Sequence, residues 1–222
     1  ANSYNMYQQS KFSQPFQLEN IKPALDADRE SSYHSRAQIF PSFVARNFGI
    51  GLLGKYNLDA KESADGTTID TFYRDDLAFV LGYNLRLFDG RIKIGFNAKL
   101  INRIEVNNPA LPTSGALDYK SIASEGTGLS TDAGIVLTAP WTFLPTVSAV
   151  VHDIGGTSFD KASGVRMTTT GRPESVPQDI DVAVALFPIH SNWVRSSWTL
   201  QYDGLLTASQ ESDKAKLLHA GI

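Results

Sequence analysis

The chain has 222 residues, a net charge of −3 and no cysteine. This length suffices for one large β domain, and the lack of cysteine excludes a disulfide framework and any thiolate metal site. The slightly acidic balance excludes the basic surface typical of nucleic-acid binding, and no apolar run is long enough for a membrane helix. A membrane barrel stays open as a fold class, because its strands are apolar only at alternate positions.

The N-terminal segment, residues 1–41, is polar, interrupted by prolines and without periodicity. Such a segment either lies irregularly on the surface or folds as a plug into a barrel lumen. Its acidic residues then become candidate partners for basic groups inside the barrel: Glu19, Asp26, Asp28 and Glu30. We therefore divide the chain into an irregular N-terminal segment, 1–41, and a strand-forming part, 42–222.

Alternation begins at Phe48 and continues to Leu58, which predicts the first strand. Residues 49–54, GIGLLG, also match the dinucleotide fingerprint G-x-G-x-x-G, which has meaning only between a strand and a helix. Here the alternation runs through the glycines and continues beyond them. We therefore interpret these glycines as places where another backbone approaches closely, and not as a nucleotide site.

The clearest pattern lies in residues 77–100. Apolar residues occupy odd positions from Leu77 to Leu87 and even positions from Ile92 to Leu100. Asp89-Gly90, between these runs, favours a two-residue type I′ turn. The pattern predicts an antiparallel hairpin whose paired residue numbers sum to 179. Each arm has roughly the 9–11 residues with which a tilted strand crosses a bilayer.

Five more alternating segments predict strands at about 127–139, 147–151, 179–186, 194–203 and from 216 onward. The connections are alternately long and short: long at 59–75, 107–126, 154–177 and 207–214, and short at 88–90, 139–145 and 188–193. Outer-membrane barrels have this alternation, with short periplasmic turns and long extracellular loops. Aromatic residues near the strand ends suit an interfacial girdle: Tyr73, Phe88, Trp141, Phe143 and Trp193.

These patterns predict an all-β fold, an antiparallel up-and-down transmembrane β-barrel with about eight strands in this chain. The last predicted strand stops soon after it begins. An open sheet edge in lipid leaves backbone groups unsatisfied. We therefore expect the chain to be part of a larger barrel of about 12–14 strands.

The polar positions of the strands define a second face, which we expect to line the lumen. The predicted lumen-facing polar row comprises Asn84, Arg86, Lys93, Asn97, Lys99, Arg103, Asp132, Asp181, Arg195, Gln201 and Asp203. Arg86 is expected directly opposite Lys93, and like charges so placed destabilise a sheet. We expect acidic groups to form ion pairs with the basic residues of this row. The candidates are the strand residues Asp132, Asp181 and Asp203 or the acidic N-terminal residues. In the second case the N-terminal segment would close the pore at rest.

Several short motifs resemble those of outer-membrane barrels related to the long-chain fatty-acid transporters (the FadL-like superfamily), including shuttle barrels of the type 9 secretion system. They are GFNAKLI at 95–101, TDAGI at 131–135, VSAVVHDIG at 147–155 and LLHAGI at 217–222. The similarity covers roughly residues 42–222, whereas the N-terminal hatch of that group is matched only by KPAL at 22–25. The resemblance implies a transport barrel and carries over no ligand-pocket residue.

Catalytic motifs are missing: the sequence has no H-E-x-x-H, no G-x-S-x-G and no phosphate loop. The four histidines lie far apart, and we interpret His152-Asp153 as a loop hydrogen bond. We expect no catalytic residue, no metal and no cofactor, hence not an enzyme, and an outer-membrane hydrolase is the least favoured function.

The favoured function is a transport barrel for a small or hydrophobic solute. The alternative is a structural or docking barrel that binds proteins of an envelope or secretion complex. The expected location is the outer membrane of a Gram-negative-type bacterium, with the lipid bilayer as partner, protein partners at the loops or the periplasmic face, and no nucleic acid.

Overall fold

A computed structural model describes residues 22–114, 122–160, 165–167, 171–189, 195–209, 211 and 213–221. The described residues are all-β, with one ten-stranded antiparallel sheet in the order β1-β3-β4-β5-β6-β7-β8-β9-β10, and β2 paired with β3. From β3 onward each strand lies beside the next one in sequence, which confirms the antiparallel up-and-down arrangement. None of the helices in these residues is long and apolar enough to cross a membrane.

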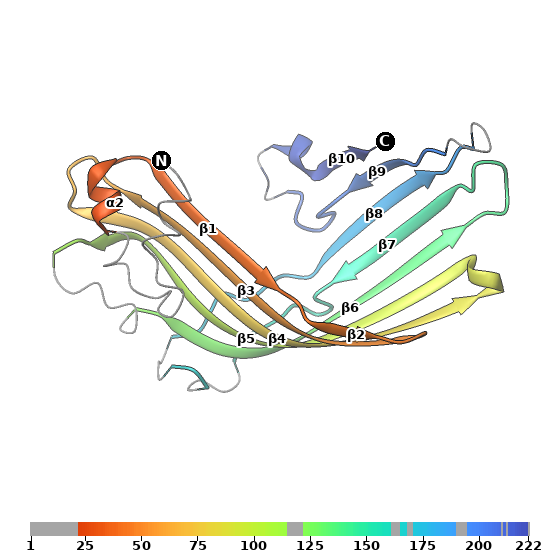
Figure 1. The fold of residues 1–222 in the computed structure, drawn as a ribbon, viewed down its shortest axis with the longest axis horizontal. Coiled ribbons are helices and arrows are strands. Elements are labelled where there is room, and N and C mark those ends of the chain that lie inside the picture. The colour runs from red at the N-terminus through yellow and green to blue at the C-terminus, as the bar shows by residue number, and fades with distance from the viewer. Residues whose placement is uncertain are drawn as a thin grey trace.

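The elements follow one another as α2 (Lys22–Ala27), β1 (Ser32–Ile39), β2 (Ser42–Val44), β3 (Phe48–Glu62), β4 (Thr68–Leu87), η2 (Phe88–Gly90), β5 (Ile92–Pro112), β6 (Ser124–Thr138), β7 (Thr146–His152), β8 (Asp179–Leu186), β9 (Trp198–Tyr202), η4 (Lys214–Leu217) and β10 (Leu218–Gly221). The sheet is strongly curved and open, with β1 and β10 as its two edges (Figure 1).

The predicted hairpin is confirmed as β4 and β5. Its pairs run from Leu87↔Ile92 through Phe79↔Leu100, in the register whose numbers sum to 179. Asp89 (φ 55°, ψ 31°) and Gly90 (φ 85°) have the left-handed backbone of a type I′ turn. The Arg91 N–H donates to the Phe88 carbonyl oxygen at 3.1 Å and closes this turn.

Several predicted loops are shorter than expected. Strands β3, β4 and β5 extend into the segments 59–75 and 107–126. The sequence of β1, SYHSRAQI, places Tyr33, Ala37 and Ile39 on odd positions between polar residues, and it pairs along β3 from Ser32↔Lys61 to Ile39↔Gly54. Residues 22–41 are therefore not irregular, because they contain α2 and β1, whose short alternation is interrupted only at Ser35.

One face of the sheet carries the core, at the end where the long loops lie. Leu25 of α2 packs there with residues of β1, β3, β4 and β5: Tyr33, Leu58, Tyr73, Ile104 and Val106. The strand pairing places Tyr73 and Val106 on the same face as Phe79 and Leu100, which are 39% and 52% exposed. This apolar face is thus covered by α2 and Met167 at one end and uncovered along the rest.

The β7–β8 connection clasps the edge of β6. Strand β7 pairs with β6 only at residues 133–138, so residues 124–132 of β6 lack a strand neighbour on that side. The Glu125 N–H donates to the Gly171 carbonyl oxygen at 3.3 Å, and Arg172 donates to the Glu125 carbonyl oxygen at 3.2 Å. We name this arrangement the β6 clasp, with residues 157–159 on one face of the sheet and 165–167 on the other.

The two faces hold the β6 clasp differently. On the apolar face, the backbone N–H groups of Arg166 and Met167 donate to the two carboxylate oxygens of buried Glu125, each at 2.8 Å. On the opposite face, Phe159 lies so close to Gly126 that a Cβ there would collide with the Phe159 carbonyl oxygen. Glycine at 126 is therefore a packing requirement.

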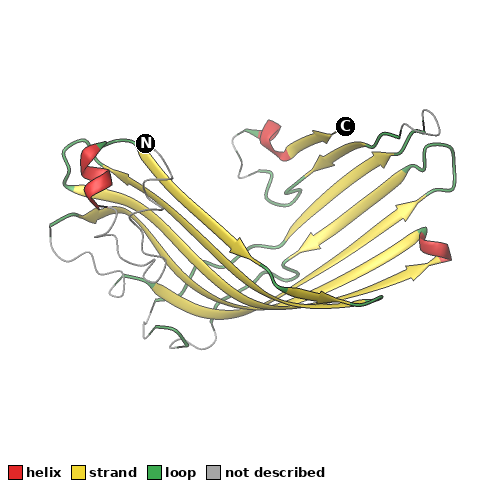
Figure 2. Cartoon of the chain, viewed as in Figure 1, coloured by secondary structure: helices red, strands yellow, loops and turns green. Residues whose placement is uncertain are grey.

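The short turns at 88–90 and 139–145 lie at one end of the sheet, on the right in Figure 2. Phe88, Trp141 and Phe143 lie in these turns and are 71%, 70% and 51% exposed. Tyr73, predicted for the same aromatic girdle, is instead fully buried in the core, because the apolar face is covered where it lies. Trp193 lies outside the described residues.

Candidate functional site: the polar face of the sheet

The register places ten residues of the predicted row on one face of the sheet, opposite the apolar face. Asp203 directly follows β9 in the same alternation, and the others are Asn84, Arg86, Lys93, Asn97, Lys99, Arg103, Asp132, Asp181 and Gln201. Arg195 does not belong to the row, because it lies before β9 in a turn bridged to Ile189. We call the face that holds these ten residues the polar face.

Ion pairs cross-link the polar face between neighbouring strands. Lys99 Nζ lies 2.9 Å from Asp132 Oδ2. Arg103 donates from Nε and Nη2 to the two oxygens of Asp76, at 2.6 and 3.0 Å, and both side chains are at most 10% exposed. Arg74 lies 2.7 Å from Glu105 Oε2. Because these side chains are buried or half-buried, removing one member of a pair would leave the other charge uncompensated.

Asp76 is absent from the sequence-predicted row, although a signal for it exists. It has the same parity as Arg86 on β4, and the 179 register places it directly opposite Arg103. The polar residues of 59–75 predict a loop, so the sequence pattern places the start of the strand at Leu77 and leaves Asp76 outside it. The carboxylate that pairs with Arg103 therefore comes from β4.

A carboxylate next to the polar face anchors the start of the β7–β8 connection. Asp153, with a left-handed φ of 48°, accepts hydrogen bonds from the hydroxyls of Ser130 and Thr157 at 2.6 and 2.7 Å. Its backbone N–H donates to Asp132 Oδ1 at 3.1 Å. Asp132 therefore serves Lys99 and the loop together, and sequence reasoning missed Asp153 in this role.

The acidic N-terminal residues that the structure describes form no ion pair with the basic residues of the row. Leu25 fixes α2 on the apolar face, and Lys22 pairs with Asp26 one helical turn later at 2.9 Å. The prediction is therefore wrong for Asp26, because α2 packs on the other side of the sheet, and among the described residues no ion pair joins Asp28 or Glu30 to the row. Glu19 and the remainder of the proposed plug lie outside the described residues.

Two histidines reach carboxylates across neighbouring strands. His152 Nε2 lies 3.0 Å from Asp181 Oδ2, and His219 Nε2 lies 3.2 Å from Asp203 Oδ2. His152 thus meets Asp181, which lies diagonally across from it on β8, and not Asp153, which the sequence suggested. Among the described residues His152 has no hydroxyl hydrogen-bonded to it, and no group of three metal-ligating side chains occurs.

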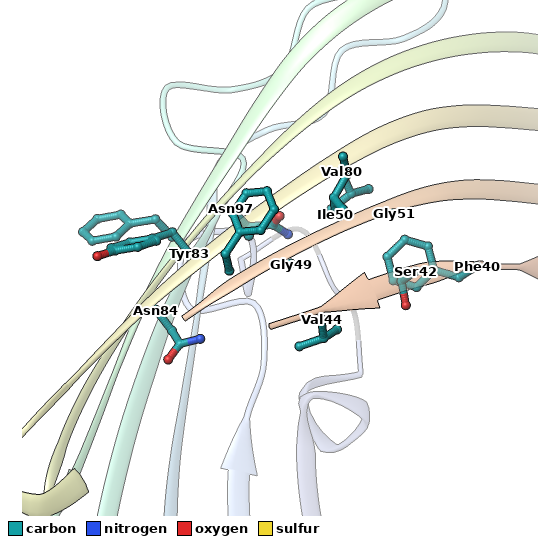
Figure 3. A pocket seen from close by; sticks show the side chains of 13 residues that line it. Phe40, Ser42, Val44, Gly49, Ile50, Gly51, Val80, Tyr83, Asn84 and Asn97 are labelled. Carbon is teal, nitrogen blue, oxygen red and sulfur yellow. The ribbon is translucent and has the colours of Figure 1, made fainter. Parts of the chain in front are cut away.

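A pocket of about 350 Å³ lies on the sheet between β2 and β5 (Figure 3). Gly49, Gly51 and Gly82 belong to its lining and lie on the polar face by register. Phe40 covers Gly51, where a Cβ would come within 2.7 Å of the Phe40 ring. The GIGLLG motif is therefore part of strand β3, and its first two glycines leave space for neighbouring side chains.

The carboxamide side chains of Asn84 and Asn97 belong to the same pocket. Two residues beyond Asn84 along β4, Arg86 lies directly opposite Lys93 of β5, as the sequence predicted. Both cations are exposed, and neither has an ion-pair partner among the described residues. The polar face thus offers a mostly apolar pocket that includes two carboxamides, close to a basic pair without an ion-pair partner among the described residues.

No family model, curated protein or solved structure matches this chain.

Proposed function

We propose that the protein is an outer-membrane β-barrel protein that passes a small solute, with the apolar face toward lipid and the polar face toward the lumen. The observation that carries this proposal is the exposed apolar band. It comprises large side chains at alternate positions of β4 to β9: Phe79, Leu81, Tyr83, Phe96, Leu100, Leu129, Leu137, Val147, Val184, Leu186, Trp198 and Leu200.

The length of this band supports lipid as its solvent. On β4 the exposed alternation runs from Leu77 to Leu87, and on β5 the apolar alternation runs from Ile92 to Leu100. This is close to the 9–11 residues of a transmembrane strand. Exposed aromatic side chains of Phe88, Trp141 and Phe143 lie at the short-turn end, where a barrel has one of its girdles.

The covered part of the apolar face supports the same assignment. Where the face leaves the exposed band, α2 and Met167 shield Tyr73, Ile104 and Val106 from solvent. A soluble protein would have to cover the whole face, because exposed apolar patches of this extent mark membrane or protein contacts. Here only the long-loop end is covered, which is the end that a barrel places in water.

The resemblance to the long-chain fatty-acid transporter group rests on the short motifs alone, and the proposal assigns no substrate from it. The ion pairs of the polar face suit a wet lumen, since ionisable groups at membrane depth pair with one another or line water.

Cysteine labelling tests the orientation, because the chain has no native cysteine. Single variants Leu81→Cys and Leu200→Cys lie on the apolar face, and their matched controls Asn84→Cys and Gln201→Cys lie on the polar face of the same strands. In native membranes we expect the first pair to react with a lipid-soluble maleimide and the second with a water-soluble one. The reverse pattern would contradict the membrane orientation.

Conductance in planar bilayers then separates transport from the docking alternative. The intact protein should form ion-conducting channels. Insertion without conductance, together with a stoichiometric protein partner on purification, would favour a docking barrel.

A further inference from the structure

We propose that the opposed pair Arg86 and Lys93 is an anion-selective site of the lumen, so that the solutes of this barrel are small anions. The inference rests on the proposed function and adds the charge of the solute to it. The two like charges of this pair lie directly opposite each other on the sheet, an arrangement that lowers stability.

Within the part of the chain that the structure describes, no ion pair joins Arg86 or Lys93 to a carboxylate. On β6 the residue opposite Lys93 is Val136, and the aspartate further along the same face, Asp132, is already bound to Lys99. Asp89, the acidic residue closest in sequence, lies in the exposed turn outside the ladder. Charges that stay unpaired on one sheet face attract mobile counter-ions.

The space around the pair is open enough to admit an ion. Asn84 is opposite Gly95, and Gly95 is opposite Gly134, so that glycines floor the polar face next to the pair. A Cβ built on Gly95 meets no atom within 4 Å. The carboxamide of Asn84 lies on the same face and can donate hydrogen bonds to an anion, whereas that of Asn97 donates to Asp132 Oδ2 at 3.3 Å.

Charge at the short-turn end is also one-sided. The described residues there carry the cations Arg46, Arg86, Arg91, Lys93 and Arg195 against the single carboxylate of Asp89. Rings of Arg and Lys are the arrangement by which pores select anions and phosphate. Among these cations, Arg86 and Lys93 are the two that the register places on the polar face.

The test measures the reversal potential of the full chain in planar bilayers under a KCl gradient. We expect the unaltered protein to prefer chloride, the double variant R86A/K93A to lose that preference, and R86E/K93E to prefer potassium. The matched control K214A/K216A removes the same charge from η4, outside the sheet, and should keep the preference for chloride.

A second measurement does not depend on conductance. Inorganic phosphate, added at constant ionic strength, should raise the melting temperature of the unaltered protein more than that of R86A/K93A. A phosphate-dependent difference without any conductance would support the anion site and contradict transport. Conductance without anion preference, and with an equal phosphate effect in both proteins, would overturn the anion site and leave transport standing.

Discussion

At the long-loop end of the sheet, Arg74, Arg103 and Arg166 each reach a carboxylate, at 2.7, 2.6 and 2.9 Å. At the short-turn end of the same strands, Arg86 and Lys93 are exposed and have no ion-pair partner among the described residues. The two ends differ in whether other segments of the chain cover the strands. The β6 clasp and α2 exclude water at one end, where an unpaired charge is costly, whereas solvent screens the charges at the other.

The largest expected effect tests this difference in cover. Arg103→Ala leaves the nearly buried carboxylate of Asp76 without its partner and should lower the free energy of unfolding by about 3–5 kcal/mol. The matched change Arg86→Ala, on the neighbouring strand, should stay within about 0.5 kcal/mol. Equal costs in urea unfolding of the two variants would show that the ends do not differ in burial.

The next effect tests the uncovered part of the apolar face. If lipid contacts this band, Leu81→Arg near the midplane should cost about 2–4 kcal/mol in reversible unfolding from bilayers. Gln201→Arg, on the polar face, is the control and should cost much less. A tolerated arginine at Leu81 would argue that the band faces water.

A pair of glycine variants then compares the two ends on one face. Gly126→Ala must displace Phe159 of the β6 clasp and should cost about 1–3 kcal/mol. Gly95→Ala points into open space and should change stability by less than about 0.5 kcal/mol. Thermal unfolding of both variants measures the difference, and a neutral Gly126→Ala would mean that the clasp does not pack tightly.

The smallest effect concerns the exposed β3–β4 turn. A hydrogen bond from the Ser63 hydroxyl, and then those from the Thr67 N–H and hydroxyl, lower the pKa of Asp65 to about 2. Because this pKa lies below the ordinary 3.8, the turn is stabilised above that value and loses the contribution as pH falls toward 2. NMR titration of the Asp65 carboxyl should show it; a midpoint near 3.8 would contradict these bonds.

The sequence predicted the middle of the sheet well because one physical signal dominates there. From Leu77 to Leu100 each face has a single character, so parity and the Asp89-Gly90 turn determine both pairing and register. Toward the long-loop end this signal fails. Asp75 and Asn102 lie on the apolar face but are satisfied by Arg166, which comes from a distant loop. Local patterns cannot anticipate such a partner, and the polar residues at these strand ends therefore predict loops.

The candidate site was predicted in part for the same reason. The polar row and the Arg86–Lys93 opposition follow from alternation alone. The acidic partners could not be predicted from alternation. Asp76 is recognised as a partner only when β4 is known to begin before Leu77, and the position of α2 is determined by the packing of Leu25.

The β6 clasp also has a consequence for how the chain avoids misassembly. A sheet edge without a strand neighbour, such as residues 124–132 of β6, is a template to which a strand of another molecule can add. Gly171 and Arg172 hydrogen-bond to Glu125 of that edge, and Ile154 donates to the Thr131 carbonyl oxygen, all from within the same chain. The β7–β8 connection therefore occupies part of an internal edge to which another chain could otherwise add.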